Sequence, residues 1–273
     1  AREERLWIAY TPTSAAVVDG DLVLTVPFQA QTPGMRPTAD ETVPLASYRL
    51  RLRAYGDADG AVALRLSTSF DADLWEESAM LSIDASLKVQ PLMVTETKQG
   101  WDITDSDRRL RAQVTTVEPP TKPWADMELA PPQPALRLVL YPDGDIPVRL
   151  AAHDHFFPSK IESVPLAYVA RNDRPHRALF SFEAESGECF AGTGERFAKL
   201  DLAGRTLVLE NTDALGVNNR RAYKNVPFYL SSRPYGLFMH TPSHIRLSLA
   251  DISTRAAQAL IEEPVVDLFI IGG

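Results

Sequence analysis

Alternation of apolar and polar residues recurs along this chain and restricts its fold more than any other feature. It is strict in YRLRLRAYG at 48–56, AVALRLSTSF at 61–70, ALRLVLYPDGD at 135–145, RTLVLEN at 205–211 and HIRLSLAD at 244–251. A period of two with one apolar face is typical of half-buried strands in antiparallel sheets. The 273 residues, 45% of them hydrophobic, are enough to bury a large core. The sequence therefore predicts an all-β protein built as a large antiparallel β-sandwich.

Turn residues and short helical patterns complete this prediction. The turn dipeptides that stand between predicted strands are Asp19-Gly20, Asp59-Gly60 and Asp143-Gly144. Helical periodicity is scarce, but the segments 71–81 and 253–263 could each form a short helix, with Asp73 and Ser253 as N-caps.

Two proline-rich stretches interrupt the strand pattern, at 31–44 and 118–134. Repeated proline removes ladder donors and stops strands, so we expect surface loops there, whose role the sequence leaves open. The strand pattern resumes unchanged after each of them. We therefore expect residues 1–273 to form one β-sandwich domain, with a minor seam near residue 120 as the one candidate boundary.

Charge and hydropathy argue against two classes of partner. Acidic residues outnumber basic ones by 36 to 28, and the densest cationic cluster is only Arg108, Arg109 and Arg111, so nucleic acid is not an expected partner. No apolar run approaches the roughly 18 residues that cross a bilayer, and the start AREERLWIAY lacks the apolar core of a secretory signal. We expect no membrane association and a cytoplasmic location.

The residues that most often hold metals give little support for a metal site. Cys189 is the only cysteine, and beside Phe190 it is expected to be a buried, inert thiol. His153-x-His155 would place two imidazoles on one face of a strand, but no third ligand stands nearby and the segment also suits a turn. We expect no bound metal.

The stretch GECFAGTGERF at 187–197 has the look of a phosphate-binding glycine loop. A dinucleotide fingerprint needs G-x-G-x-x-G opening a helix, whereas Gly192-x-Gly194 leads into a broken segment and then a strand. We therefore expect no cofactor. The alternative is a tight crossing between strands, in which Glu195 and Arg196 pair with neighbours.

The residues after the glycines carry a more specific pattern. FAGTGERF at 190–197 is followed by ENTDALGVNNRRAYKNVPFYLSSRPYGLFMHTPSHIRLSL at 210–249. The pieces of the pattern, in order, are Gly192, Gly194, Glu195, Arg196 and Phe197; Asn211 and Asp213; Tyr223, Lys224, Asn225, Pro227, Phe228 and Tyr229; and Tyr235 and Gly236. Over about 185 to 250 this chain resembles glycoside hydrolase family 31, which includes α-glucosidases and α-xylosidases.

The resemblance implies an architecture and a chemistry. The segment would belong to an N-terminal β-sandwich of the galactose-mutarotase-like type, a supersandwich with few short helices, that precedes a catalytic (β/α)8 barrel. Retaining cleavage needs two carboxyl groups, which in this family are aspartates on the barrel. No barrel pattern follows VVDLFIIGG at 265–273, so this chain alone is expected to be inactive.

Site residues also follow from the resemblance. A loop of the family's sandwich reaches over the barrel mouth, and its aspartate, which is Asp213 by position, contacts the sugar of an α-linked oligosaccharide or glycoside. Capping of a turn is the other role open to Asp213. The residues expected to support the loop are Glu195, Arg196, Asn211, Lys224 and Asn225. The implied role of the whole sandwich is to buttress the barrel of the same polypeptide, and exposed interface aromatics would favour a homo-oligomer without it.

Two other functions remain open from the sequence. A stand-alone aldose 1-epimerase would need a histidine and a carboxylate for acid and base chemistry. The candidate histidines are His153, His155, His176, His240 and His244. A stand-alone carbohydrate-binding module would stack exposed aromatics on sugar rings, and Trp75, Trp101 and Trp124 are the candidates.

Overall fold

The computed structural model describes residues 4–31, 46–57, 60–69, 87–115, 136–151, 165–172, 174–213 and 222–273. Within these ranges every regular element is a β-strand, which confirms the all-β prediction. The helix expected at 253–263 is wrong, because this segment contains strand β19 (Ala256–Ile261). The proposed helix at 71–81 and its cap Asp73 lie outside the described residues, as do the proline-rich segments beyond Gln31.

Two antiparallel sheets make up the described structure. The larger holds β1 (Glu4–Ala9), β2 (Ser14–Val18), β3 (Asp21–Gln31), β4 (Ala46–Asp57), β5 (Gly60–Ser69), β6 (Lys88–Gln90), β12 (Leu166–Arg171), β13 (Arg174–Glu183), β14 (Phe190–Gly194), β15 (Arg205–Leu209), β16 (Asn225–Ser231), β17 (Tyr235–Met239), β18 (Ile245–Leu249), β19 and β20 (Asp267–Gly272). The smaller holds β7 (Met93–Thr97), β8 (Gly100–Thr104), β9 (Leu110–Thr115), β10 (Arg137–Leu140) and β11 (Val148–Arg149).

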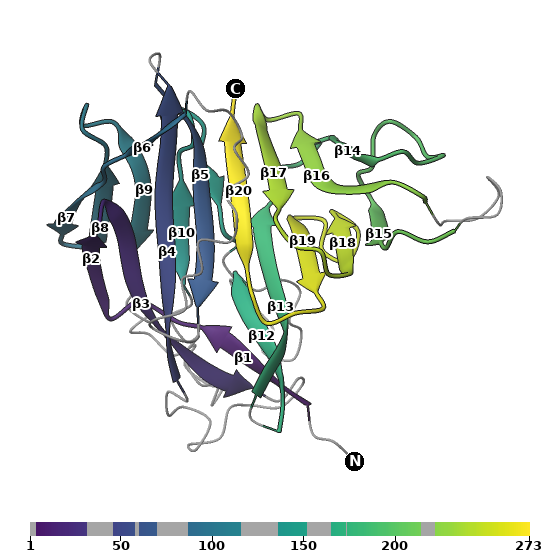
Figure 1. Cartoon of the computed structure of the whole chain (residues 1–273), viewed down its shortest axis with the longest axis horizontal. Helices are drawn as coiled ribbons and strands as arrows, with labels where there is room; N and C mark the ends of the chain where they lie inside the picture. The colour runs from purple at the N-terminus through teal and green to yellow at the C-terminus, as the bar shows by residue number, and fades with distance from the viewer. Residues whose placement is uncertain are drawn as a thin grey trace, which may run out of the picture.

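The order of strands determines which segments become neighbours. The large sheet runs β14-β16-β17-β20-β5-β4-β3-β1-β12-β13-β19-β18-β15, so two strands that are close in sequence, β14 and β15, lie at its opposite ends. The sheet curls far enough to bring β15 back near β16 (Figure 1). The segments that carry the family pattern therefore meet at this seam, where the ends of the sheet approach each other.

The core lies between the inward faces of the two sheets. One cluster of buried side chains joins residues of the large sheet, such as Leu50 and Phe180, to residues of the smaller sheet, such as Val114 and Leu138. At its centre the rings of Phe28 and Tyr48 lie 4.3 Å apart, and Tyr168 stacks on Tyr48 at 5.3 Å. Burial of these large rings contributes to the hydrophobic stabilisation.

Two charged residues that enter the core, Asp105 and Arg111, form an ion pair. Asp105 accepts hydrogen bonds from the backbone of its own turn and from Arg111 Nε at 2.8 Å, and Arg111 is only 1% exposed. Buried charges are tolerated only with partners of this kind. The cationic cluster predicted around Arg108 and Arg109 is thus divided, because one of its three arginines is buried in a pair.

The structure confirms the turns predicted at Asp19-Gly20 and Asp143-Gly144. Asp19 and Gly20 have φ of 53° and 86° between β2 and β3, the backbone that a two-residue hairpin requires. Gly144 has φ of 94° in the connection between the paired strands β10 and β11. Asp59 lies outside the described residues.

Division into domains is not tested by this architecture and stays a prediction. Among the described residues no helix is long and apolar enough to cross a membrane.

Glu4 connects β1 to β12 and β13 by ion pairs, and these should make the free energy of unfolding depend on pH. Its carboxylate accepts hydrogen bonds from Arg171 and, at 3.1 Å, from Arg177, and the first of these holds the pKa of Glu4 below its ordinary value of 4.5. A depressed carboxyl pKa stabilises the fold above the unfolded value, and this contribution is lost as pH falls through the folded value.

We therefore expect Glu4→Gln to lower the denaturant midpoint at pH values well above 4.5, and the difference from the parent to vanish as pH falls below it. Urea titrations of both proteins across this range measure the difference. A gap that stays constant with pH would mean that the carboxylate charge does not contribute.

Candidate functional site

The two glycines of the family pattern form a crossing between strands. Strand β14 pairs with β16 and shifts register between Gly192 and Gly194. Gly192, Thr193 and Gly194 have φ of 114°, 66° and 90°, three successive residues in the left-handed region. A Cβ on Gly194 would lie 2.1 Å from the carbonyl oxygen of Lys224, so only glycine fits this contact. This geometry supports the crossing that the sequence offered in place of a phosphate loop.

The crossing can be tested against a glycine that has the same strain but no contact. Gly187 has φ of 82°, and a Cβ added to it would meet nothing within 4 Å, so Gly187→Ala should cost about 1 kcal/mol of backbone strain. Gly194→Ala adds the collision with β16 and should cost about 2 kcal/mol more. Chemical denaturation measures both, and equal losses would show that β14 and β16 are not held this closely.

Glu195 and Arg196 follow the crossing directly. The sequence suggested that they pair with neighbours, and the structure gives each its own partner. Glu195 accepts a hydrogen bond from Lys224 Nζ at 3.2 Å, in a surface pair whose two side chains are both exposed. Arg196 is half-buried, and it donates to the Val208 carbonyl oxygen at 2.8 Å and to Asn225 Oδ1. Burial lowers the pKa of this guanidinium, which remains charged because an arginine pKa starts above 12.

Asn225 is the centre of the hydrogen-bond network. Its side-chain nitrogen donates to the Glu210 carbonyl oxygen at 2.8 Å, to Asn211 Oδ1 at 2.9 Å and to the Ala222 carbonyl oxygen at 3.1 Å. Its backbone nitrogen donates to Asn211 Oδ1 at 2.7 Å. With Arg196 bound to its oxygen, one amide joins the segment after β14, the end of β15 and the start of β16. We call these linked groups the Asn225 hub.

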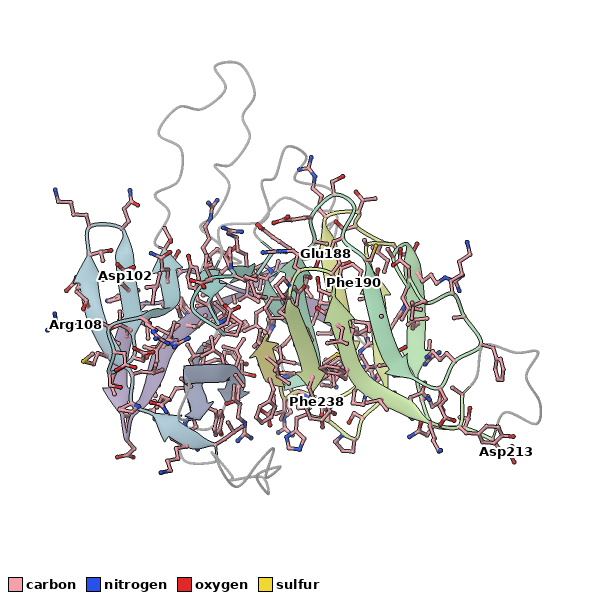
Figure 2. All side chains as sticks on the ribbon, turned by 90° about the horizontal axis from the view of Figure 1, so that it is seen from above. Asp102, Arg108, Glu188, Phe190, Asp213 and Phe238 are labelled. Atoms are coloured by element: carbon pink, nitrogen blue, oxygen red, sulfur yellow. The ribbon has the colours of Figure 1, made fainter. Side chains whose placement is uncertain are left out.

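Asp213 lies just beyond this hub. Asn211 forms a parallel bridge with Ala222, and the backbone nitrogen of Thr212 donates to the Ala222 carbonyl oxygen at 3.4 Å. These contacts hold both ends of the segment between 213 and 222 together. Asp213 itself is exposed and stands at the edge of the molecule, at the end opposite Asp102 and Arg108 (Figure 2). The hub and these contacts thus fix the residues that directly precede this exposed carboxylate in the chain.

The hub should matter for stability where the neighbouring surface pair does not. Asn225→Ala removes four hydrogen bonds of the side chain and leaves half-buried Arg196 with the Val208 carbonyl oxygen as its remaining acceptor among the described residues, so a loss of about 2 kcal/mol is expected. Lys224→Ala removes an exposed ion pair, for which about 0–1 kcal/mol is usual. Thermal or urea unfolding compares them, and equal effects would contradict the central role of Asn225.

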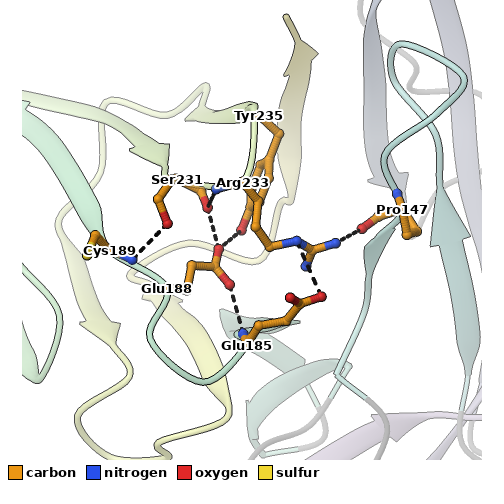
Figure 3. Close-up of polar contacts among 8 residues, drawn as sticks. Pro147, Glu185, Glu188, Cys189, Ser231, Arg233 and Tyr235 are labelled. Atoms are coloured by element: carbon orange, nitrogen blue, oxygen red, sulfur yellow. Dashed lines mark hydrogen bonds and ion pairs between the residues drawn. The ribbon is translucent and has the colours of Figure 1, made fainter.

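A second polar cluster fixes the turn that leads into β14 (Figure 3). Glu188 is 6% exposed, and its carboxylate accepts hydrogen bonds from the Glu185 backbone nitrogen at 2.8 Å, from Tyr235 OH at 3.2 Å and from Ser231 Oγ. The guanidinium of Arg233 donates a hydrogen bond to the carbonyl oxygen of Pro147. Pro147 directly precedes β11, so this bond connects the cluster to the smaller sheet. The sequence did not single out Glu188, although an acid between a turn glycine and a strand was a usable signal.

The sequence also offered histidines and tryptophans as candidate site residues. Three histidines pair with carboxylates: His176 with Glu4, His240 with Asp267 and His244 with Glu210. Within the described part of the chain no three His, Cys, Asp or Glu residues gather as metal ligands do. His153, His155, Trp75 and Trp124 lie outside that part, and Trp101 is half-buried in β8.

The prediction that Cys189 is buried is wrong. Cys189 is exposed, because it precedes β14 on the outward side while Phe190 points into the core at 1% exposure. Asp201 raises the pKa of the thiol through a hydrogen bond, so this cysteine lacks the lowered pKa of a reactive nucleophile.

Comparison with known proteins identifies the class to which this fold and pattern belong. The chain is a member of the family described as the glycosyl hydrolase 31 N-terminal galactose mutarotase-like domain, whose model matches residues 64–247. It is 33% identical to an α-xylosidase of Emericella nidulans over 101 residues, which are 37% of this chain and 13% of that enzyme. It is 34% identical to a 1,3-α-isomaltosidase of Kribbella flavida over 105 residues, or 36% of this chain and 14% of that enzyme. The match therefore spans a small part of each relative.

Solved structures confirm the fold. A cycloalternan-forming enzyme of Listeria monocytogenes aligns with 99% of this chain and 21% of its own, with a TM-score of 0.63 and 16% identity. A family 31 dextranase of Flavobacterium johnsoniae aligns with 97% of this chain and 26% of its own, with a TM-score of 0.62 and 15% identity. The predicted mutarotase-like sandwich and the suspected family are thus both confirmed.

Proposed function

We propose that this chain is the N-terminal part of a retaining α-glycosidase of the α-xylosidase or α-glucosidase type, and that Asp213 contributes to its substrate-binding rim. Membership of the family and the similarity to hydrolases of α-linked sugars support the activity. The catalytic carboxylates would stand on a barrel elsewhere in the same polypeptide, which the sandwich buttresses. The chain alone would then lack hydrolase activity, and the complete enzyme would act in the cytoplasm.

The Asn225 hub is the observation that supports a role for Asp213. Four hydrogen bonds of Asn225 hold Glu210, Asn211 and Ala222, which lie on either side of the segment that begins at Asp213, and so restrict where this carboxylate can stand. A positioned carboxylate accepts hydrogen bonds from adjacent sugar hydroxyls, and it discriminates against sugars that lack them. Preorganisation of this kind reduces the entropy lost when substrate binds.

The proposal is tested by Asp213→Ala in the complete enzyme. Loss of hydrogen bonds to a charged acceptor should lower kcat/KM for α-glycosides roughly ten- to hundredfold, with an unchanged melting temperature. Steady-state kinetics on aryl α-xylosides and α-glucosides measure this effect. Asp213→Asn, which keeps one acceptor oxygen, should fall between Ala and the parent.

Asp107→Ala is a matched control. Asp107 is also an exposed aspartate in a connection, but it directly precedes Arg108, which lies at the end of the molecule opposite Asp213 (Figure 2). Its kinetics should equal those of the parent. Unchanged kinetics for Asp213→Ala on every α-glycoside would leave Asp213 only as a turn residue.

A further inference from the structure

Strand β2 is an end strand of the large sheet with one unpaired edge. Among the described residues it pairs only with β3, on one side, and Figure 1 shows it at the end of the molecule opposite β15. Four of its five residues, Ser14, Ala16, Val17 and Val18, are exposed. An unpaired edge presents a row of backbone N–H and C=O groups to which another strand can form hydrogen bonds.

The other end strands that the structure describes carry features that hinder such pairing. Strand β14 shifts register and contains three successive residues of positive φ, and β11 has only two residues. Strands β15, β6 and β7 include Arg205, Lys88 and Glu96, respectively. Bulges, short length and charge are the devices that protect sheet edges in natural proteins. Strand β2 has none of them, because its five residues SAAVV include no charged residue, proline or glycine.

The hairpin formed by β2 and β3 determines which backbone groups of β2 remain available. The two strands are joined by a two-residue turn, and such a turn is closed by a hydrogen-bonded pair, here Val18 and Asp21. Hydrogen-bonded pairs alternate along an antiparallel ladder, so every second residue counted back from Val18 directs its backbone groups to β3. The N–H and C=O groups of Ala15 and Val17, which alternate with these residues, therefore point to the open edge.

The available groups match those of a second copy related by a two-fold axis. When two β2 strands pair in antiparallel orientation about Ala16, Ala15 of each copy lies opposite Val17 of the other, and both residues offer a donor and an acceptor. Ala16 then faces its own counterpart, and Ser14 faces Val18. Like charges directly opposite each other destabilise such a pair, and no charged side chain of β2 meets its own copy across this axis.

Apolar side chains beside the open edge would add buried surface to this pairing. Val17 and Val18 are 41% and 51% exposed, and Met93, the first residue of β7, is 45% exposed. The backbone nitrogen of Leu92 donates to the carbonyl oxygen of Gly20 at 3.2 Å, so β7 begins beside the turn that follows β2. Two strands alone are marginally stable in water, and burial of these side chains would supply further stabilisation.

We propose that β2 is a self-association surface, at which two copies of this chain join their large sheets by antiparallel pairing of their β2 strands. The inference does not depend on the proposed function. Strand β2 and strand β15, which Asp213 follows closely in the chain, lie at opposite ends of the molecule (Figure 1). Pairing through β2 would therefore leave the Asp213 segment of each copy accessible.

Sedimentation velocity of the complete polypeptide tests this surface. The parent should be a dimer that dissociates on dilution. Ala16→Lys should raise the dissociation constant at least about tenfold, because two ammonium groups would then face each other across the axis. Ile252→Lys is the control, because it places the same charge at an exposed apolar position between β18 and β19. Its dissociation constant should equal that of the parent.

Cysteine variants test the register of the pairing and do not rely on the lysine variant. They are made in a Cys189→Ser background, because Cys189 is exposed. Ala16→Cys should form a disulfide between copies under mild oxidation, since opposite residues of a non-hydrogen-bonded pair lie close enough for one. Val18→Cys alone should not, but mixed with Ser14→Cys it should form a disulfide between the two variants.

Three results would overturn the proposal. They are a polypeptide that is monomeric at every concentration, a dimer whose dissociation constant Ala16→Lys leaves unchanged, and a disulfide between two copies of Val18→Cys. All three measurements report on association and none on hydrolysis of α-glycosides. The proposed function can therefore fail while this inference holds, and the reverse.

Discussion

The side-chain amide of Asn225 is the interaction on which this end of the molecule depends. A primary amide offers two N–H donors and one carbonyl acceptor. Asn225 uses them to hold Glu210, Asn211, Ala222 and Arg196. Arg196 in turn donates to the Val208 carbonyl oxygen, in β15, which is the far end of the sheet in strand order. A single side chain therefore secures the seam between the two ends of the curled sheet.

The glycine crossing makes this arrangement possible. Because Gly192 and Gly194 lack Cβ atoms, β14 can approach the backbone of β16 closely enough for Arg196 to reach Asn225. Glu188 fixes the turn on the other side of β14, because its carboxylate accepts hydrogen bonds from Ser231 in β16 and Tyr235 in β17. Both ends of this short strand are thus anchored by polar contacts, and the substrate role proposed for Asp213 relies on that rigidity.

The sequence predicted the fold well where one face of a strand is buried and the other exposed. Strands β10, β15 and β18 fall within the alternating segments, and β4 and β5 overlap theirs over nearly their whole length. Strand β19 escaped detection because AAQALI is buried on nearly every position, so it has no alternation and its alanines favour a helix. Tertiary pairing with β13 and β18 overrides that local preference.

The sequence grouped the candidate site residues, but it did not predict the contacts among them. A pattern of residues identified Glu195, Arg196, Asn211, Lys224 and Asn225 as one group, but spacing does not say which member is central or which donors pair. That information depends on how β14, β15 and β16 meet, which is a property of the folded sheet. Exposure of Cys189 likewise follows from which face of β14 it adjoins rather than from its apolar neighbours.

The central claim is that the hub presents Asp213 to a bound sugar, and a crystal structure of the complete enzyme with a non-hydrolysable α-glycoside tests it most directly. The account predicts a carboxylate oxygen of Asp213 within a hydrogen-bond distance of about 2.5–3.0 Å from a sugar hydroxyl, with the Asn225 contacts intact. A structure in which the sugar is bound and Asp213 faces solvent would contradict it.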